Sequence, residues 1–404
     1  MENKVLTFIK THWEKTVQPA REDVPFPFNS PCENSFYTDF FYWDLYFINK
    51  GLLATNLSKQ AENNLDDMAY FVNKIGYVPN SNGLLNRSQP PVFTLCVYDL
   101  YLFKKDINVI KKYIDVLLKE HDFFMKKRMT PIGLNSFGDS ASDKEIMEHY
   151  FMHCDRVKEY SRDPKKQYVI GKDIIAIAES GLDFNMRFKT KESKIAAHEF
   201  AHLDLNCWLY LVETRLEEML LLIDRKEEGN EFNNLRKERK EKINKYFFNE
   251  KEGLYLDYNY INNTFSKVLT CVSLYPFAFG ISRDRESALK VLNKLEYEHG
   301  VSCAEYRGED IYYQWDYPIM WGEVSLIVYA ALKNVGADKE AKRVKDKYMA
   351  TIETNFEKTG KLWEKYDSRT GEISNVEYAS PAFMGWTAAS YQLFAQGNDI
   401  VFGK

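Results

Sequence analysis

The sequence predicts an all-α protein, and three observations support this prediction. First, ten segments carry apolar residues at three- and four-residue spacing, the period that places them on one face of a helix. Second, the alternation typical of a short strand is found only at residues 254–258 and 301–306. Third, glycines and prolines such as Gly76, Pro79 and Gly336 separate the helical segments.

The helical segments follow one another along the whole chain. Allowing for weaker segments, we expect roughly a dozen helices, at about 34 residues for each helix and its connection. That number suits an α-solenoid or a closed ring of six helical hairpins, and no repeat of fixed period favours the solenoid. The helices are expected at residues 45–57, 61–75, 92–103, 107–124, 203–223, 232–248, 283–295, 324–335, 341–356 and 382–393.

The chain contains no stretch with the composition of a linker. Neither a Gly/Ser-rich nor a Pro-rich segment interrupts the helical pattern. We therefore expect residues 1–404 to form one domain, in which residues 1–23 are a candidate N-terminal capping helix.

Composition excludes several classes of protein. The 54 Lys and Arg residues stand against 59 Asp and Glu, so no basic excess points to nucleic acid or an anionic membrane. The first residues lack the apolar core of a signal peptide, and the longest aliphatic run, 220–223, is too short to span a membrane. Six widely spaced cysteines without a CxxC pair indicate reduced thiols. We expect a soluble cytoplasmic protein.

Aromatic residues make up 15% of the chain, and many lie beside acids and amides rather than in apolar stripes. The clearest clusters are residues 36–47 and 311–321. Such clusters suit a sugar, which presents an apolar ring face and a rim of hydroxyl groups. Packing between large helices would explain any single cluster equally well.

Three segments with carboxylates, residues 178–188, 314–321 and 375–388, carry the residue types that glycoside hydrolysis needs. That reaction takes one protonated and one ionised carboxyl group, about 6.5–9.5 Å apart in an inverting enzyme. Asp183 follows a Ser-Gly-Leu turn between apolar neighbours, a setting that raises a carboxyl pKa and suits a general acid. Glu377 lies among polar residues, a setting that suits an ionised base.

Residues 198–202 read HExxH, a pattern typical of zinc peptidases. On a helix, His198 and His202 would face one zinc ion, with the glutamate between them as general base. The extended form of the motif fails, because Leu205 and Trp208 occupy its Gly and His positions. A zinc metallopeptidase is therefore an alternative of another class, whereas the simpler interpretation is two histidines in ordinary hydrogen bonds. We expect no metal and no cofactor.

Several stretches in the same order resemble the α,α-trehalase family of glycoside hydrolases, from about residue 25 to 395. In addition, Glu377 keeps the nine-residue spacing from the family's catalytic base to the tryptophan of GWTNG, here Trp386. The similar stretches are residues 41–46 (FYWDLY for YYWDSY), 77–80 with 86–91 (for IPNGN…SRSQPP), 179–184 (for SGWD), 202–206 (for VDLN) and 314–321 (QWDYPIMW for QWDYPNGW).

The resemblance implies an (α/α)6 toroid and an inverting hydrolysis that needs no metal. It implies that Asp183 protonates the glycosidic oxygen and that Glu377 deprotonates the attacking water. Arg156 and Glu159 resemble the family's substrate-binding Arg-Pro-Glu, at a spacing that differs by one. The implied substrate-binding residues are Trp43, Asp44, Asn80, Arg87, Gln89, Arg156, Glu159, Gly181, Trp315, Asp316, Trp321 and Trp386.

The sequence departs from the family at several subsite positions. The GGRFRE segment, which supplies a sugar-binding arginine, reads SFYTD at residues 35–39. Phe36 does not replace a guanidinium group that makes charge-assisted hydrogen bonds to hydroxyls. The other departures are Leu182 for the tryptophan of SGWD, Ile319-Met320 and Ala388-Ala389 for Asn-Gly pairs, and residues 373–376 for a glycine run.

These features predict an inverting α-glycosidase that hydrolyses an α-linked disaccharide, with trehalose as the leading substrate. A sibling enzyme that acts on another α-glucoside or on a glycosyl-glycerate is the alternative within this class. A sugar-binding or inactive homologue is the alternative outside it, and the presence of both Asp183 and Glu377 argues against it. The expected partner is a small saccharide, without nucleic acid or membrane, and the sequence predicts no oligomeric state.

Overall fold

Six mostly apolar helices form a closed ring in the computed structural model, which describes residues 3–33, 38–308, 313–398 and 402. Each helix packs against the next, and the last returns to the first. A helix without a polar face must be covered on every side, and residues 385–394 of the last helix are all buried. In order, the ring consists of α2 (Asp44–Leu53), α4 (Phe93–Lys104), α8 (Leu203–Leu222), α10 (Tyr275–Ala278), α12 (Gly322–Asn334) and α14 (Gly385–Gln396).

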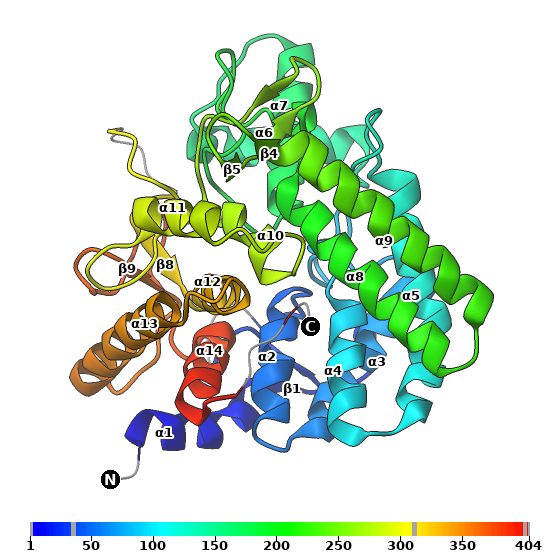
Figure 1. The fold of residues 1–404 in the computed structure, drawn as a ribbon, viewed down its shortest axis with the longest axis vertical. Coiled ribbons are helices and arrows are strands. Elements are labelled where there is room, and N and C mark those ends of the chain that lie inside the picture. The colour runs from blue at the N-terminus through cyan, green and yellow to red at the C-terminus, as the bar shows by residue number, and fades with distance from the viewer. Residues whose placement is uncertain (1–2, 34–37, 309–312, 399–401, 403–404) are drawn as a thin grey trace.

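A second set of helices covers the ring from outside, as Figure 1 shows at the periphery of the molecule. These helices are amphipathic; one of them buries Ile110, Ile114, Leu117 and Phe124, which share one face. The two layers together are the (α/α)6 toroid expected from the resemblance, so the predicted fold class is confirmed. The outer helices are α1 (Lys4–His12), α3 (Ser58–Ile75), α5 (Ile107–Lys127), α9 (Lys226–Phe247), α11 (Arg285–Leu295) and α13 (Asp338–Thr359).

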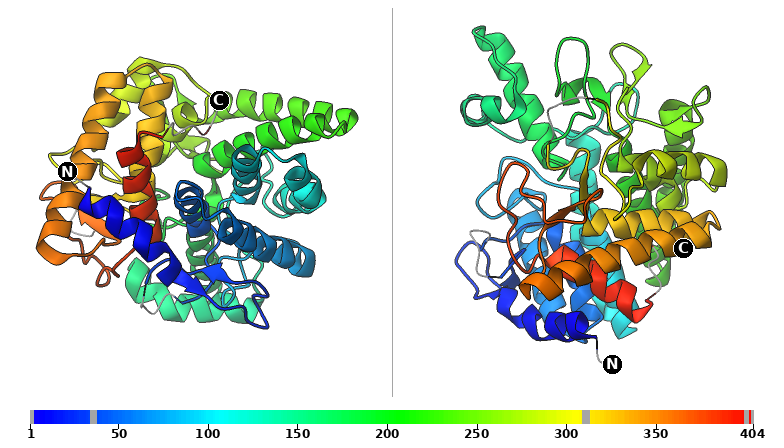
Figure 2. Two further views of the ribbon diagram at one scale, coloured as in Figure 1. Left: turned by 90° about the horizontal axis from the view of Figure 1, so that it is seen from below. Right: turned by 90° about the vertical axis from the view of Figure 1, so that its left-hand side faces the viewer.

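Each of the ten predicted helical segments coincides with a helix, but two long helices were not predicted. They are α6 (Asp143–Val157) and α7 (Pro164–Glu179), which pack on each other and project from the rest of the molecule (Figure 2, right). Their apolar periodicity is weak, yet the sequence marks where both begin. Ser142 forms a capping box with Glu145, and Pro164 occupies the first turn of α7.

The strands are short, antiparallel and confined to the connections. The predicted strand at residues 254–258 splits into two, whereas residues 301–306 form only isolated bridges, at Val301 and Ala304. The paired strands are β1 (Val17–Gln18) with β2 (Phe28–Asn29), β3 (Phe200–Ala201) with β6 (Tyr258–Asn259) and β7 (Thr264–Phe265), β4 (Phe248–Asn249) with β5 (Leu254–Tyr255), and β8 (Ile319–Trp321) with β9 (Lys365–Asp367).

The N-terminal segment packs beneath the last ring helix. The Trp13 indole donates to Gln392 Oε1 at 3.0 Å, and Asn3 Nδ2 donates to the Tyr391 hydroxyl at 2.9 Å. Helix α1 therefore packs against α14. Of the candidate capping helix at residues 1–23, only Lys4–His12 is α-helical in the described part of the chain, and a 3-10 turn and β1 follow it.

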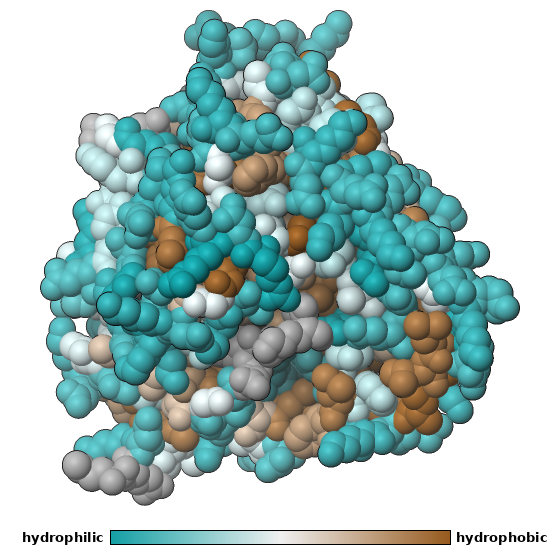
Figure 3. Space-filling model, in the orientation of Figure 1, coloured by the Kyte–Doolittle hydropathy of each residue, from teal (hydrophilic) through white to brown (hydrophobic). Residues whose placement is uncertain are grey.

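The surface agrees with the composition. Figure 3 shows a mostly hydrophilic face on which apolar residues gather in separate patches. Within the described ranges, no helix combines the length and the hydropathy that a membrane span needs. The six cysteines, which all lie in the described part of the chain, form no disulfide, and Cys154 alone among them is not buried.

A buried ionic cluster joins the chain after α7 to the start of α8. The Arg187 guanidinium is fully buried and donates to both oxygens of Asp204, at 2.6 and 2.7 Å, and to both of Asp257, at 2.8 Å. Asp257 also accepts from the amide of Leu203 at 2.9 Å. One cation thus compensates two buried carboxylates, which would otherwise be costly to desolvate.

We expect Arg187→Met to lower the free energy of unfolding by about 3–5 kcal/mol, because it leaves two buried carboxylates without a counter-ion. Denaturant unfolding monitored by circular dichroism measures this loss. The matched control is Arg369→Met, since Arg369 pairs with Asp367 at a surface position and its loss should cost less than about 1 kcal/mol. Equal losses in the two variants would contradict this account of the cluster.

Candidate active site

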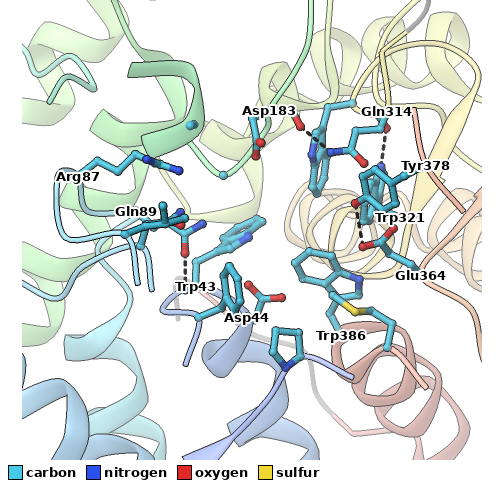
Figure 4. A pocket seen from close by; sticks show the side chains of 18 of the residues that line it. Trp43, Asp44, Arg87, Gln89, Asp183, Gln314, Trp321, Glu364, Tyr378 and Trp386 are labelled. Carbon is cyan, nitrogen blue, oxygen red and sulfur yellow. Dashed lines mark hydrogen bonds between the residues drawn. The ribbon is translucent and has the colours of Figure 1, made fainter. Parts of the chain in front are cut away.

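A pocket lies at the N-terminal ends of three ring helices, α2, α12 and α14 (Figure 4). It holds about 700 Å³ of space not filled by atoms, a volume that includes its open mouth. Its lining comes from segments far apart in the chain, namely Pro31, Phe41, Trp43, Asp44, Asn80, Leu84, Arg87, Gln89, Arg156, Ala178, Gly181, Asp183, Gln314, Trp315, Trp321, Glu364, Tyr378, Met384 and Trp386.

Most of the predicted site residues meet in this pocket. Glu377 is not itself a lining residue, but it bonds to one that is, Arg156. Glu159 and Asp316 do not line the pocket. The predicted residues that do so are Trp43, Asp44, Asn80, Arg87, Gln89, Arg156, Gly181, Asp183, Trp315, Trp321 and Trp386.

Four tryptophans form the apolar part of the lining. Trp315 and Trp321 are stacked, with ring centroids 4.0 Å apart and planes 3° from parallel. Trp386 meets Trp321 edge-on at 5.3 Å, and Trp43 lies 6.3 Å from Trp386. Flat aromatic faces beside polar groups are the surface that a sugar ring fits.

Hydrogen bonds to Glu179 and Trp43 fix the loop that carries Arg87 and Gln89. The backbone amide of Ser88 donates to Glu179 Oε1 at 2.8 Å, and Gln89 Oε1 accepts from the amide of Trp43 at 3.0 Å. Both polar side chains therefore face the pocket from a backbone that is anchored to neighbouring elements.

Asp183 follows α7 through a turn that needs a glycine. Gly181 has φ +76°, and a Cβ there would lie 3.2 Å from the Trp43 ring. The Asp183 carbonyl accepts from Gln314 Nε2 at 2.6 Å and from Arg156 Nη2 at 3.2 Å. These contacts fix the backbone, so that the carboxyl group extends into the pocket (Figure 4).

The surroundings of Asp183 disfavour its ionised form. Burial raises the pKa of the Asp183 carboxyl, and the positive charges of Arg156 and Arg87 oppose this rise. The nearest cationic atom is Arg156 Nη1, 3.8 Å from Asp183 Oδ2. The direction of the shift is the one that its apolar neighbours in the sequence predicted.

Glu377 lies in a left-handed backbone conformation, with φ +66°, and its side chain is 11% exposed. Arg156 donates to Glu377 Oε2 from Nε at 3.0 Å and from Nη2 at 2.6 Å. Burial raises the pKa of Glu377, and Arg156 is the main opposing influence. The polar neighbours in the sequence suggested a setting for an ionised base, and the structure adds a cation, Arg156, that favours the ionised form.

One guanidinium group thus links Asp183 and Glu377, which are far apart in the sequence. Arg156, near the end of α6, contacts both carboxyl groups. Both carboxyl groups therefore lie within 3.8 Å of one guanidinium group.

The two predicted residues outside the pocket have structural partners. Glu159 Oε1 accepts from the amide of Lys194, which holds the loop after Arg187. Asp316 is fully buried and forms an ion pair with Arg307 at 3.2 Å. Neither carboxylate is placed to contact a ligand in the pocket.

Sequence reasoning missed Glu364, which lines the pocket. This carboxyl group is buried; its Oε1 accepts from the Tyr378 hydroxyl at 3.0 Å, and Lys365 Nζ donates to its Oε2 at 2.7 Å. Burial raises the pKa of Glu364, as it does for Asp44 on the pocket floor. The available signal was an acid between aromatic residues, in the WEKY of residues 363–366.

The HExxH segment does not have the geometry that a zinc site needs. His198 lies in a short 3-10 turn, β3 follows it, and His202 precedes the first turn of α8. His198 Nδ1 pairs with Asp173 at 2.6 Å, whereas His202 Nδ1 accepts from the amide of Phe137 at 2.9 Å. The helical i, i+4 arrangement considered for the two histidines was therefore wrong.

Most residues that differ from the family's motifs do not line the pocket. Five substituted positions are buried in the core and do not line the pocket. Phe36, at the position of the missing arginine, lies outside the described residues. The five core positions are Leu182, Ile319, Met320, Ala388 and Ala389.

The chain is similar to several known proteins along most of its length. The periplasmic trehalase of Salmonella newport (strain SL254) is 26% identical over 401 residues, covering 94% of this chain and 70% of the relative. The neutral trehalase Nth1 of Saccharomyces cerevisiae has a similar fold, with TM-score 0.75, 18% identity and coverage of 99% and 81%. The mannosylglycerate hydrolase of Thermus thermophilus has TM-score 0.68, 16% identity and coverage of 96% and 100%.

A family model matches almost the whole chain. Residues 22–397, which contain every residue of the pocket lining, match the model described as Trehalase. The chain belongs to the trehalase family of glycoside hydrolases.

Proposed function

We propose that the protein hydrolyses an α-linked disaccharide with inversion of configuration, and that this disaccharide is trehalose. Asp183 acts as the general acid and Glu377 as the general base. The observation that carries this proposal is the pair of carboxyl groups joined through Arg156 at a tryptophan-lined pocket. The names of its relatives support the substrate, since both the Salmonella and the yeast protein are trehalases.

The surroundings of the two carboxyl groups suit different roles. Arg156 makes two hydrogen bonds to the Glu377 carboxylate but stands 3.8 Å from the nearest carboxyl oxygen of Asp183, so its charge stabilises the ionised form of Glu377 more strongly. Desolvation raises the pKa of Asp183 with less compensation from Arg156, although its side chain is 33% exposed, and Asp183 is therefore the group that keeps its proton. It gives this proton to the glycosidic oxygen, while Glu377 takes a proton from the water that attacks the anomeric carbon.

The rest of the lining suits a sugar. Trp315 and Trp386 provide apolar faces, and Asp44, Asn80 and Arg87 provide hydrogen-bonding groups for hydroxyls. Because five departures from the family's motifs lie in the core, they leave the described part of this lining unchanged.

A glycosyl-glycerate is the second candidate substrate. Two arginines, Arg87 and Arg156, line the pocket near Asp183, and a guanidinium group binds a carboxylate as readily as a hydroxyl. A structural neighbour is a mannosylglycerate hydrolase, which acts on a sugar linked to such an acid.

A cytoplasmic location stays a prediction, because the Salmonella relative is periplasmic.

We expect Asp183→Asn and Glu377→Gln each to lower kcat on trehalose by at least about 10²-fold, because each removes an acid or base from the reaction. Enzymatic assay of released glucose measures the rate. Asp122→Asn, an exposed change on α5, is the control and should keep the wild-type rate. A variant of Asp183 or Glu377 with near-normal turnover would show that its role is assigned wrongly.

We expect Arg156→Gln to move both limbs of the pH profile of kcat/KM to higher pH. The Arg156 charge lowers the pKa of Glu377 and of Asp183, so its removal lets both values rise. The acid limb follows deprotonation of the base and the alkaline limb follows deprotonation of the acid, and both therefore shift upward. The control is Arg225→Gln, a change at the surface. A downward shift, or none, would contradict the assigned charges.

A further inference from the structure

Lys365 is a fully buried cation beside the pocket. Its side chain is 0% exposed, and its ammonium group donates to Glu364 Oε2 at 2.7 Å. The ammonium also lies 3.5 Å from the centre of the Tyr378 ring and 5.5 Å from that of Trp321. Glu364 and Tyr378 are linked in turn by a 3.0 Å hydrogen bond, drawn in Figure 4. The three side chains form a closed group, the 364–365–378 cluster.

Burying charged groups costs folding free energy unless they form hydrogen bonds or ion pairs with one another. A buried ammonium needs an anion and further electrostatic support, which Glu364 and the face of the Tyr378 ring supply. Tyr378 is held at two points, its hydroxyl by Glu364 and its ring by Lys365. The residue before it is Glu377.

The loop that carries Glu377 is tied down at its base as well. The amide of Ser374 donates to the Lys365 carbonyl at 3.0 Å. Ser380 closes the loop, because its hydroxyl donates to the Ser374 carbonyl at 2.6 Å and its amide donates to Asn375 Oδ1 at 3.0 Å. Residues 374–380 therefore form a short loop anchored on β9.

The backbone at Glu377 requires such anchoring. A non-glycine residue in the left-handed region is strained and persists where the surrounding contacts determine it. Arg156 holds the Glu377 side chain from the α6 wall, but Arg156 also lines the pocket and is exposed to exchange with a bound ligand. The 364–365–378 cluster supports the residue next to Glu377 without depending on a bond to Arg156.

We infer that Glu364, Lys365 and Tyr378 are positioning residues for the base, holding the 374–380 loop so that the Glu377 carboxylate keeps its place when Arg156 turns to the substrate. The inference rests on the proposed role of Glu377. Glu364 then acts through Tyr378, although it lines the pocket. A misplacement of about 1 Å at a reacting group can cost about 10²-fold in rate, so loss of this support should lower kcat.

The anchoring itself is tested on the free protein by hydrogen–deuterium exchange. Tyr378→Phe keeps the ring on Lys365 and removes the hydrogen bond to Glu364, and we expect amide exchange in residues 374–380 to become at least about tenfold faster. The matched control is Tyr391→Phe, which removes a 2.7 Å bond to Glu353 away from the pocket and should leave that loop unchanged. Unchanged exchange in Tyr378→Phe would overturn the inference.

The consequence for catalysis is tested by steady-state kinetics on trehalose. We expect Tyr378→Phe and Glu364→Gln each to lower kcat about tenfold or more with KM within about twofold. Tyr378→Phe removes the hydrogen bond to Glu364, and Glu364→Gln removes the charge that pairs with Lys365. Because both changes act on the same cluster, the double variant should lose less activity than the product of the two single losses.

Two kinetic results would overturn the inference. A raised KM with unchanged kcat in Glu364→Gln would make Glu364 a substrate ligand. If the losses of kcat in the two single variants multiplied fully in the double variant, Glu364 and Tyr378 would act independently of each other. If the wild-type protein releases no glucose from trehalose, the proposed substrate fails, while the exchange experiment still decides the anchoring.

Discussion

The buried fork of Arg187 between Asp204 and Asp257 is the constraint on which the site depends. It fixes the segment after Asp183 to the start of α8, inside the ring. From there, hydrogen bonds lead across the pocket, since the Asp183 carbonyl accepts from Gln314 and the Gln314 carbonyl accepts from the Trp321 indole. Trp321 lies on β8 opposite Lys365 of β9, the strand that anchors the loop of Glu377. Acid and base are thus parts of one connected framework.

A closed ring of helices gives this framework its shape. The N-terminal ends of α2, α12 and α14 meet at the pocket, and their partial positive charge favours the carboxyl groups that gather there. Burial acts in the opposite direction, because it raises the pKa of Asp44, Asp183, Glu364 and Glu377 alike. Nearby cations then make the pKa values of these carboxyl groups differ from one another. Arg156 opposes the rise at Asp183 and Glu377, and Lys365 opposes it at Glu364.

The sequence predicted most of the fold because the outer helices carry a clear apolar face and the inner helices are apolar along most of their length. It missed α6 and α7, whose apolar residues do not form a single stripe; α6 exposes Phe151 and Met152 yet buries His149. The motifs predicted most of the pocket lining, but partners distant in the chain, such as Arg156 with Glu377, leave no local pattern. Glu364 was overlooked because an acid beside a lysine is typical of a solvated surface.

The most direct test of this account is proton NMR of trehalose incubated with the protein and an excess of chelator, following the anomeric signals of glucose. Inversion at one of two α-linked centres predicts equal initial amounts of α- and β-glucose, and a reaction driven by carboxyl groups should not respond to the chelator. Initial release of α-glucose alone, a reaction stopped by the chelator, or no release at all would contradict the account.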